Sequence, residues 1–444
     1  MNFRGVFTAA TPQFLSITHP ERTLVARAGR PLTCPASRAL AVGIYSEHHR
    51  LVDEVIERVA PYPVHRFQGR GIVTCAGGPR FFTCAWVLVR VLRDILKTAL
   101  PVQVWHRGAA EIDPLMRALL ERYDVEVIDA CGIASLRPPS QGWALKPFAI
   151  LHSRFQEVLF LDADNVPAVD PARLFAAAPY RETGAIFWPD LKPIPVESPI
   201  WEICRVPYRD EPSFESGQIV LDKARCWKAL LLTMHMNERG DFYYQHLYGD
   251  KDTFHMAWRY LEQPYSMVPH PPRLILGEQV DPLFVYLSWV LGQCDFDGGV
   301  ILQHRNTPKF ILFGKNPRYP GFVYEEECLG FLDELARLWN GRVSTLELQP
   351  PEDYQSNGAT RWFRYVRVSH EEKMIEFQPN QRIGYGSSRW ERTWRVIPEG
   401  PTSVLEILGD EYVTCRLTRH QDGVWRGRWL RYERNPVELI PWRA

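Results

Sequence analysis

Val158-Leu159-Phe160-Leu161-Asp162-Ala163-Asp164-Asn165 is the most informative stretch of this chain. Four consecutive apolar residues are typical of a strand that is buried on both faces of a parallel sheet. Two carboxylates, one residue apart, follow where this strand ends. Ligands of open α/β sheets bind beyond the carboxyl ends of the strands, and carboxylate oxygens suit hard divalent cations. The stretch therefore predicts a cation site at the sheet edge; a solvated turn is the alternative interpretation.

Strands and helices alternate on both sides of this stretch. Before it, the periodicity predicts strands around 71–76, 102–106 and 125–128, and helices over 40–60, 82–97, 111–122 and 144–153. After it, we expect helices over 223–236, 252–261 and 330–340, with a late strand over 298–303. Such alternation predicts an α/β fold with a largely parallel sheet. Right-handed crossovers would bring Gly77-Gly78 and the two aspartates to one edge of the sheet.

The texture of the chain changes beyond about residue 345. Short alternating or aromatic runs are separated there by Gly, Pro, Asn and Asp, which is typical of a β-meander. We therefore expect three parts: an N-terminal extension and helix (1–64), an α/β catalytic domain (65–340) and a small all-β domain (345–444). The first forty residues show little periodicity and are expected to wrap or fray. In the last part, Trp425 and Trp429 lie on one face of a regular strand and Arg426 and Arg428 on the other. An interior tryptophan pair is expected; an aromatic platform for a glycan acceptor, or a docking pad for a partner, is the alternative.

Composition excludes several classes of protein. Lys+Arg and Asp+Glu balance at 52 each, so no nucleic-acid partner is expected. The nine cysteines are odd in number and form no Cys-x-x-Cys pair, which fits neither a disulfide framework nor a zinc knuckle and favours a reducing compartment. No apolar run is long enough to span a membrane, and no secretory signal pattern is found. A soluble, cytoplasmic protein is the expectation.

Two segments before the acidic stretch offer candidate phosphate contacts. Gly77 and Gly78 follow a strand and lack side chains, so a nucleotide can approach their backbone, with Arg80 nearby. A tight turn is the alternative, and no Gly-x-Gly-x-x-Gly supports a dinucleotide fold. Trp143 can stack on a sugar or base, and Lys146 can pair with a phosphate. A lysine is unfavourable at a helix start, which favours a specific role over a surface position.

Three later segments supply the remaining candidates. Glu215 and Gln218 can bind sugar hydroxyls or face the anomeric carbon, or else belong to a solvated loop. Asp250 and Asp252 open a helix, and a helix N-cap is the simplest interpretation of either. His304 follows the late strand and can be the third ligand of a cation held by Asp162 and Asp164, a mixed set that suits Mn²⁺ better than Mg²⁺. Lys309 can then neutralise a leaving diphosphate.

Taken in order, these segments resemble the fungal Golgi α-mannosyltransferases of glycosyltransferase family 71. The resemblance covers about residues 65 to 312 and rests on seven segments: Gly69–Gly78, Leu100–Trp105, Lys146–Phe148, Leu161–Asn165, Glu215–Gln218, Gly249–Phe254 and His304-Arg305. It implies a GT-A-like fold, here in a soluble, bacterial-type form, and a retaining, α-linking transfer of mannose from GDP-mannose with Mn²⁺ or Mg²⁺. The fungal members carry a membrane anchor, whereas none is expected in this chain, and the resemblance does not extend to the β region.

The same resemblance places Asp250, Lys251 or Asp252 near the anomeric carbon, with Glu215 as the other candidate. Retention by a covalent intermediate or by same-face attack within an ion pair both stay open. The acceptor is expected to be a glycan or another hydroxyl compound. A UDP-hexose-dependent transferase is one alternative. An inactive module that binds a sugar or nucleotide sugar is an alternative of another class.

Overall fold

The computed structural model describes residues 35–133, 142–277, 289–351, 361–399, 402–431 and 433–442. Most of the N-terminal stretch expected to wrap or fray lies outside these residues. Residues up to Asp53 and those from Glu54 onward form two units. The helix predicted over 40–60 is α1 (Pro35–Glu57), which crosses the boundary between them.

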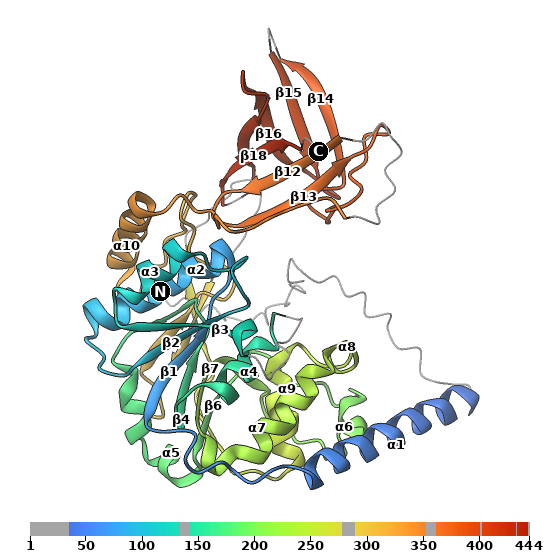
Figure 1. Ribbon diagram of the computed structural model, residues 1–444. Helices are drawn as coiled ribbons and strands as arrows, with labels where there is room; N and C mark the ends of the chain where they lie inside the picture. The colour runs from blue at the N-terminus through green and yellow to red at the C-terminus, as the bar shows by residue number, and fades with distance from the viewer. Residues whose placement is uncertain are drawn as a thin grey trace, which may run out of the picture. The chain divides into compact units, whose positions relative to one another are not determined.

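A seven-stranded sheet forms the centre of the second unit (Figure 1). Its order is β3-β2-β1-β4-β7-β6-β8. The strands are β1 (Arg70–Cys75), β2 (Val102–His106), β3 (Val125–Asp129), β4 (Glu157–Leu161), β6 (Ala185–Pro189), β7 (Phe214–Asp222) and β8 (Ser266–Met267). The first four run parallel, and β7 lies antiparallel between β4 and β6. The predicted α/β class with a mostly parallel sheet is confirmed.

Helices pack on both faces of this sheet. On one face lie α4 (Leu145–His152), α7 (Lys223–Glu238) and α9 (Asp250–Tyr260) (Figure 1). The main apolar core on the other face contains α2 (Gly78–Arg90), α3 (Pro114–Glu121) and α10 (Glu325–Leu338). The helix predicted over 82–97 continues from α2 into a π-helical turn, Val91–Ile95. Three short helices complete the set: α5 (Ala178–Thr183), α6 (Ile200–Ile203) and α8 (Gly240–Tyr243).

A second, four-stranded sheet begins directly after the acidic stretch. Its order is β5-β11-β10-β9, all antiparallel, with β5 (Asn165–Pro167), β11 (Val300–His304), β10 (Trp289–Cys294) and β9 (Arg273–Leu276). The late strand predicted over 298–303 is β11. Its last residue, His304, is paired with Asn165, so the tertiary fold carries the histidine to the end of the Asp-x-Asp segment.

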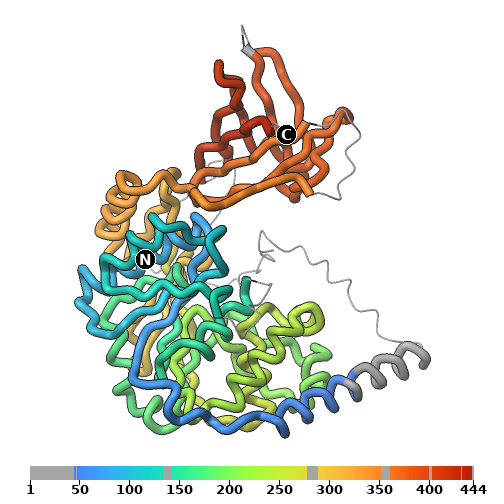
Figure 2. Tube along the Cα trace, viewed as in Figure 1, coloured from blue at the N-terminus to red at the C-terminus, as the bar shows by residue number. Residues whose placement is uncertain are grey.

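The C-terminal strands form an antiparallel sheet with its own apolar core, as expected for an all-β domain. They are the orange and red part of the trace (Figure 2). The order is β13-β12-β18-β17-β16-β15-β14. The strands are β12 (Arg361–Arg367), β13 (Glu371–Phe377), β14 (Thr393–Glu399), β15 (Thr402–Leu408), β16 (Val413–Arg419), β17 (Trp425–Trp429) and β18 (Pro436–Pro441). The periodicity had missed β13 and β18.

The tryptophan pair of β17 faces the interior of this sheet. Trp429 is 3% exposed within the core and the partly buried Trp425 packs against it. On the opposite face Arg426 pairs with Glu438, and Arg428 donates to the carbonyl of Arg434. The interior interpretation is therefore confirmed, and Trp429 is too deeply buried to act as a sugar platform.

The close contact between β1 and Phe155 yields a stability prediction. A Cβ at Gly71 would lie 2.3 Å from Cζ of Phe155, a ring that is itself 1% exposed. Gly71→Ala should therefore destabilise the fold by about 1–3 kcal/mol through overpacking. Gly330→Ala is the matched control, because α10 leaves open space there and alanine favours helix by up to ~1 kcal/mol. Urea denaturation measures both; a Gly71→Ala protein as stable as the wild type would contradict the packing.

Candidate active site

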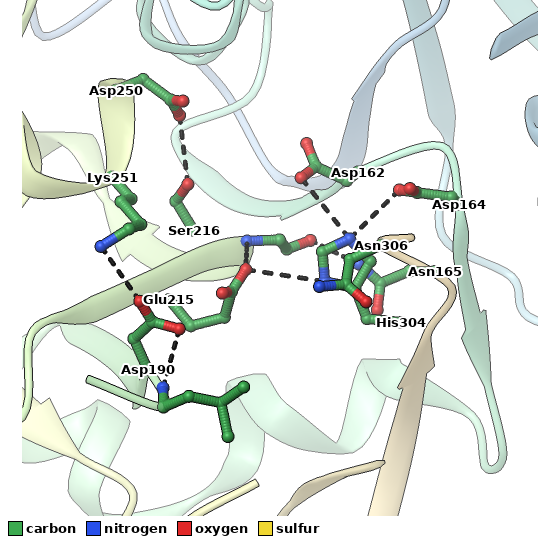
Figure 3. A network of polar contacts seen from close by, with 12 residues as sticks. Asp162, Asp164, Asn165, Asp190, Glu215, Ser216, Asp250, Lys251, His304 and Asn306 are labelled. Carbon is green, nitrogen blue, oxygen red and sulfur yellow. Dashed lines mark hydrogen bonds and ion pairs between the residues drawn. The ribbon is translucent and has the colours of Figure 1, made fainter. Parts of the chain in front are cut away.

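Asp162 and Asp164 lie where β4 ends and the chain turns into β5 (Figure 3). The backbone N–H of Asp162 donates to the carbonyl of Gly217 (2.7 Å), and that of Asn165 donates to the carbonyl of Asp162 (2.9 Å). The side chain of Asp162 is 31% exposed and that of Asp164 only 3%. The tight turn therefore presents one accessible and one buried carboxylate at the sheet edge.

His304 completes a group of three side chains that can hold a cation. Its Nε2 lies 3.2 Å from Oδ1 of Asp164 and 3.9 Å from Oδ2 of Asp162. One potential ligand atom from each residue lies within 4.8 Å of the other two. Figure 3 shows the imidazole facing both carboxylates. Two carboxylates and an imidazole fit a divalent cation such as Mn²⁺.

The absence of a side chain at Gly217 leaves room for the imidazole of His304. A Cβ at this position would lie 2.5 Å from Cε1 and Nδ1 of His304. The same residue accepts from the N–H of Asp162 and from Nδ2 of Asn165 (2.6 Å) through its carbonyl. The glycine of the Glu-Ser-Gly-Gln segment is therefore required by close packing against the candidate ligand.

The three groups have divergent pKa values. Burial alone would raise the pKa of Asp164, but Lys309 and His304 outweigh it and hold that pKa well below its usual range. Burial raises the pKa of Asp162 and the neighbouring Asp164 charge adds to it, although Lys146 acts in the opposite direction. Burial lowers the pKa of His304, but Asp164 raises it above the ordinary value. The cluster therefore attracts positive charge, and a bound dication would favour the deprotonated ligands.

Lys146 joins the acidic turn to the start of α9. Its Nζ lies 3.2 Å from Oδ1 of Asp162 and 3.0 Å from Oδ2 of Asp250, and it donates to both oxygens of Ser216 at 2.8 Å. Burial lowers the pKa of Lys146, but the two carboxylates outweigh it and raise the pKa above its usual range. The lysine at the start of α4 is therefore buried among carboxylates and not on the surface.

A second lysine, the partly buried Lys251, contacts two other carboxylates. Its Nζ lies 3.0 Å from Oδ2 of Asp190 and 2.8 Å from Oδ1 of Asp252. The other oxygen of Asp252 accepts from the N–H of Tyr248 (2.9 Å). The N-cap interpretation of Asp250 and Asp252 is wrong, because the N-cap is Gly249, whose φ of 77° favours glycine, and both aspartates lie in the first turn. Negative charge is favourable there.

Glu215 stands beside the imidazole on the side away from the aspartates (Figure 3). Its Oε1 accepts from the N–H of Gly217 (2.7 Å) and lies 3.6 Å from Nδ1 of His304. Burial raises the pKa of Glu215, although His304 acts in the opposite direction. The glutamate is therefore part of the same polar group as the candidate cation ligands.

The residues predicted to contact the nucleotide or sugar near Gly77 and Trp143 differ from one another in how much space surrounds them. A Cβ at Gly77 would meet Glu111 at 2.1 Å, whereas the space beside Gly78, whose φ is +72°, is open. Nη2 of Arg80 lies 3.9 Å from Oε1 of Glu433. Trp143 is 42% exposed, and a Cβ at Gly249 would approach its ring to 3.1 Å.

Gln218 is fully buried, whereas Lys309 is partly buried. The amide atoms of Gln218 have no hydrogen-bond partner among the described residues. The ammonium of Lys309 contacts the carboxylate of Asp164. Lys309 is therefore next to the candidate cation site, whereas Gln218 is covered by the fold.

Three residues of the site were missed. Asn165 and Ser216 belong to the Asp-x-Asp and Glu-Ser-Gly-Gln segments, so their place in the sequence could have identified them as site residues. Ser216 donates to Asp250 (3.1 Å), and Asn165 braces Gly217. Asp190 follows β6 with no surrounding pattern, and only the fold reveals that it pairs with Lys251.

Fold and site together define an α/β domain with an Asp-x-Asp turn and a histidine at the carboxyl edge of the central sheet. Residues 69–205 and 206–281 match the family model described as "Mannosyltransferase putative". The matched residues amount to slightly less than half of the chain and include the candidate residues up to the start of α9.

Two fungal proteins named alpha-1,2-mannosyltransferase are similar to this chain. Alpha-1,2-mannosyltransferase MNN5 of Saccharomyces cerevisiae is 26% identical over 338 residues, covering 62% of this chain and 55% of its own. Alpha-1,2-mannosyltransferase MNN24 of Candida albicans is 30% identical over 167 residues, covering 29% of this chain and 24% of its own. The chain thus spans about half the length of MNN5 and about a quarter of the length of MNN24. Both are fungal, so they give no support to the expected bacterial-type form.

Solved glycosyltransferases share a more distant similarity. The galactosyltransferase LgtC is 13% identical with a TM-score of 0.38, covering 63% of this chain and 98% of its own. The mannosyltransferase Ktr4p of S. cerevisiae is 11% identical with a TM-score of 0.33, covering 49% and 75%. Within the part of the chain that the structure describes, none of the helices has the length and apolar character needed to cross a membrane.

The geometry predicts which side chains a cation requires. Asp164→Asn and His304→Ala should each weaken Mn²⁺ binding at least about tenfold, because each removes one of few inner-sphere ligands. Asp222→Asn is the matched control: Asp222 caps α7 at the opposite end of β7, and asparagine caps equally well. Titration followed by electron paramagnetic resonance measures the free Mn²⁺. Unchanged affinity in both site variants would refute the assignment.

Proposed function

We propose that this chain is a metal-dependent glycosyltransferase that moves a hexose from a nucleotide sugar to a hydroxyl acceptor. The group of Asp162, Asp164 and His304 at the sheet edge is the observation that carries the proposal. A divalent cation at this place suits a diphosphate leaving group. The family match and the relatives named alpha-1,2-mannosyltransferases support mannose as the sugar and an α-linkage as the product.

GDP-mannose is the favoured donor, with Mn²⁺ or Mg²⁺ as the cation and a glycan or another hydroxyl compound as the acceptor. UDP-hexose remains the alternative donor. A binding module without turnover is the alternative of another class, and the complete candidate ligand set argues against it, because a binder has less need of a grip on a leaving group. Residues 65–340 would form the catalytic domain, and residues 345–444 would support it.

The chain's own residues can perform distinct tasks in such a transfer. When bound, the cation would supply electrostatic stabilisation of the charge that grows on the diphosphate. Lys309 adds positive charge beside Asp164. Gly78, Arg80 and Trp143 are proposed to contact the nucleotide or sugar, Gln218 to support β7 from within, and Lys146 to hold Asp162 and Asp250 in place.

Glu215 and Asp250 are the proposed groups next to the reacting sugar, while Lys251 and Asp252 are proposed to fix the start of α9. This division rests on the contacts. Lys251 and Asp252 are paired with each other, whereas Glu215 lies beside His304 and Asp250 is joined to Asp162 through Lys146. Retention through a covalent intermediate on a carboxylate, or by same-face attack within an ion pair, is compatible with this arrangement.

Donor choice can be measured directly. With Mn²⁺ present, the full chain should hydrolyse or transfer from GDP-mannose faster than from GDP-glucose, UDP-glucose or UDP-galactose, and chelation should abolish the reaction. Nuclear magnetic resonance of the product should show the α-anomer. The Asp164→Asn protein serves as the inactive control. Faster turnover of a UDP-hexose would favour the alternative donor, and the absence of both turnover and nucleotide binding would defeat the enzyme proposal.

The proposed roles predict different effects on kcat for Glu215 and Asp250 than for Asp252. Glu215→Gln and Asp250→Asn should each lower kcat by about 100-fold or more, because an amide is neither a nucleophile nor an anionic stabiliser. Their Mn²⁺ affinity should change far less than that of Asp164→Asn. Asp252→Asn, in the same helical turn as Asp250, should lose thermal stability and retain most of kcat. Equal loss of kcat in Asp250→Asn and Asp252→Asn would reject this division of roles.

A further inference from the structure

The turn that follows His304 wraps around Asp164. The backbone N–H of Arg305 donates to the carbonyl of Asp164 (2.9 Å). Four residues later Lys309 contacts the carboxylate of Asp164 and donates to the carbonyl of Asn306 (3.0 Å). With Nε2 of His304 at 3.2 Å, one short loop therefore contacts both the backbone and the side chain of Asp164.

Arg305, in the middle of these contacts, has a fully buried side chain. Its Nε donates to the carbonyl of Pro308 (2.8 Å), which closes the turn. Its guanidinium carbon lies over three aromatic rings: 4.2 Å from the ring centre of Phe310, 4.9 Å from that of Tyr319 and 5.5 Å from that of Phe322. We call these three rings the aromatic cage.

The cage holds the charge of Arg305 mainly by stacking. Nη1 and Nη2 form no hydrogen bonds to the described residues, and Oε1 of Glu325 lies 3.9 Å from Nη1. Burial lowers the pKa of Arg305. Removing a cation from water is costly, and three cation–π contacts offset part of that cost. A cation buried in this way is not explained by stability alone, because an apolar side chain would fill the same cage.

The side chain of Arg305 contacts the segment that leads into α10. Glu325, whose carboxylate lies 3.9 Å from Nη1 of Arg305, is the first residue of α10. Tyr319 and Phe322 belong to the segment that leads into this helix. The influence of Arg305 on Asp164 therefore runs through its backbone N–H and through the closed turn. It is a mechanical influence, and not that of a neighbouring charge.

We propose that Arg305 is a positioning residue of the cation site: its caged guanidinium and its bond to Pro308 set the turn that places His304 and Lys309 on Asp164. The inference rests on the proposed cation site. A planar guanidinium suits this role because it can stack and donate through Nε at the same time, which a lysine cannot do. Groups that orient metal ligands commonly affect affinity as strongly as this proposal requires.

A second caged arginine supplies a matched control. Arg90 on α2 is also buried, and its guanidinium carbon lies 4.3 Å from the ring centre of Phe331, 4.9 Å from that of Tyr123 and 5.2 Å from that of Trp86. It pairs with Asp94 and Glu334 and contacts none of the candidate ligands in any described interaction. Loss of one ring from each cage therefore compares the same substitution beside a caged arginine at two places.

The experiment measures Mn²⁺ affinity of the full chain without donor, by electron paramagnetic resonance, at a temperature where every variant is folded. Arg305→Met should raise the Kd at least about tenfold, and Phe310→Leu about threefold, because both loosen the turn. Phe331→Leu should stay within about twofold of the wild type, although its melting temperature falls. Arg305→Lys should restore thermal stability in part and leave the Kd raised, since Nε is absent.

A spectroscopic signal distinguishes positioning from general damage. Nitrogen hyperfine coupling from His304 to bound Mn²⁺ should weaken in Phe310→Leu and persist in Phe331→Leu. Wild-type affinity and coupling in Arg305→Met or Phe310→Leu would overturn the inference, as would equal losses in Phe331→Leu. If Arg305→Met does not fold, Phe310→Leu decides alone. Absence of Mn²⁺ binding by the wild type would instead refute the cation site itself, which is a different failure.

Discussion

A three-residue antiparallel pairing between β5 and β11 is the contact on which the whole site depends. It sets His304 opposite Asn165, directly after the acidic turn. Because side chains on paired strands alternate, a shift of this register by one residue would turn the imidazole to the other side of the sheet. The second sheet has its edge strand β5 directly after the acidic turn, so the turn that presents the carboxylates also begins the strand that pairs with the histidine.

Buried charge around this contact is compensated by pairs and small networks. Lys146 lies between Asp162 and Asp250, and Lys251 lies between Asp190 and Asp252. Two of these pairs, Lys146 with Asp250 and Lys251 with Asp190, join elements distant in sequence and hold α9 beside the sheet edge. Removing one partner of such a pair leaves an uncompensated buried charge, which costs far more than the pair itself contributes. These networks therefore give the site its geometry more than the fold its stability.

Close packing of glycine complements these charges. Gly217 allows the ring of His304 to lie against β7, and Gly249 lets the start of α9 approach Trp143. Neither position resembles a phosphate-binding glycine loop. Their common feature is that a side chain placed there would displace an aromatic or imidazole ring from the site. Close packing at these two glycines therefore restricts where the imidazole and the indole can lie.

The sequence by itself determined the alternation of strands and helices, the parallel half of the sheet and the all-β C-terminal region, and it identified Asp162 and Asp164 as candidate cation ligands. These features depend on local periodicity and on the chemistry of neighbouring residues. The tertiary structure alone decided that Asp190 meets Lys251, that Gly249 and not an aspartate caps α9, and that Lys146 is buried between two carboxylates. It also revealed β6, β13 and β18. Such features depend on pairing between distant segments, and periodicity within one segment carries no information about its partner.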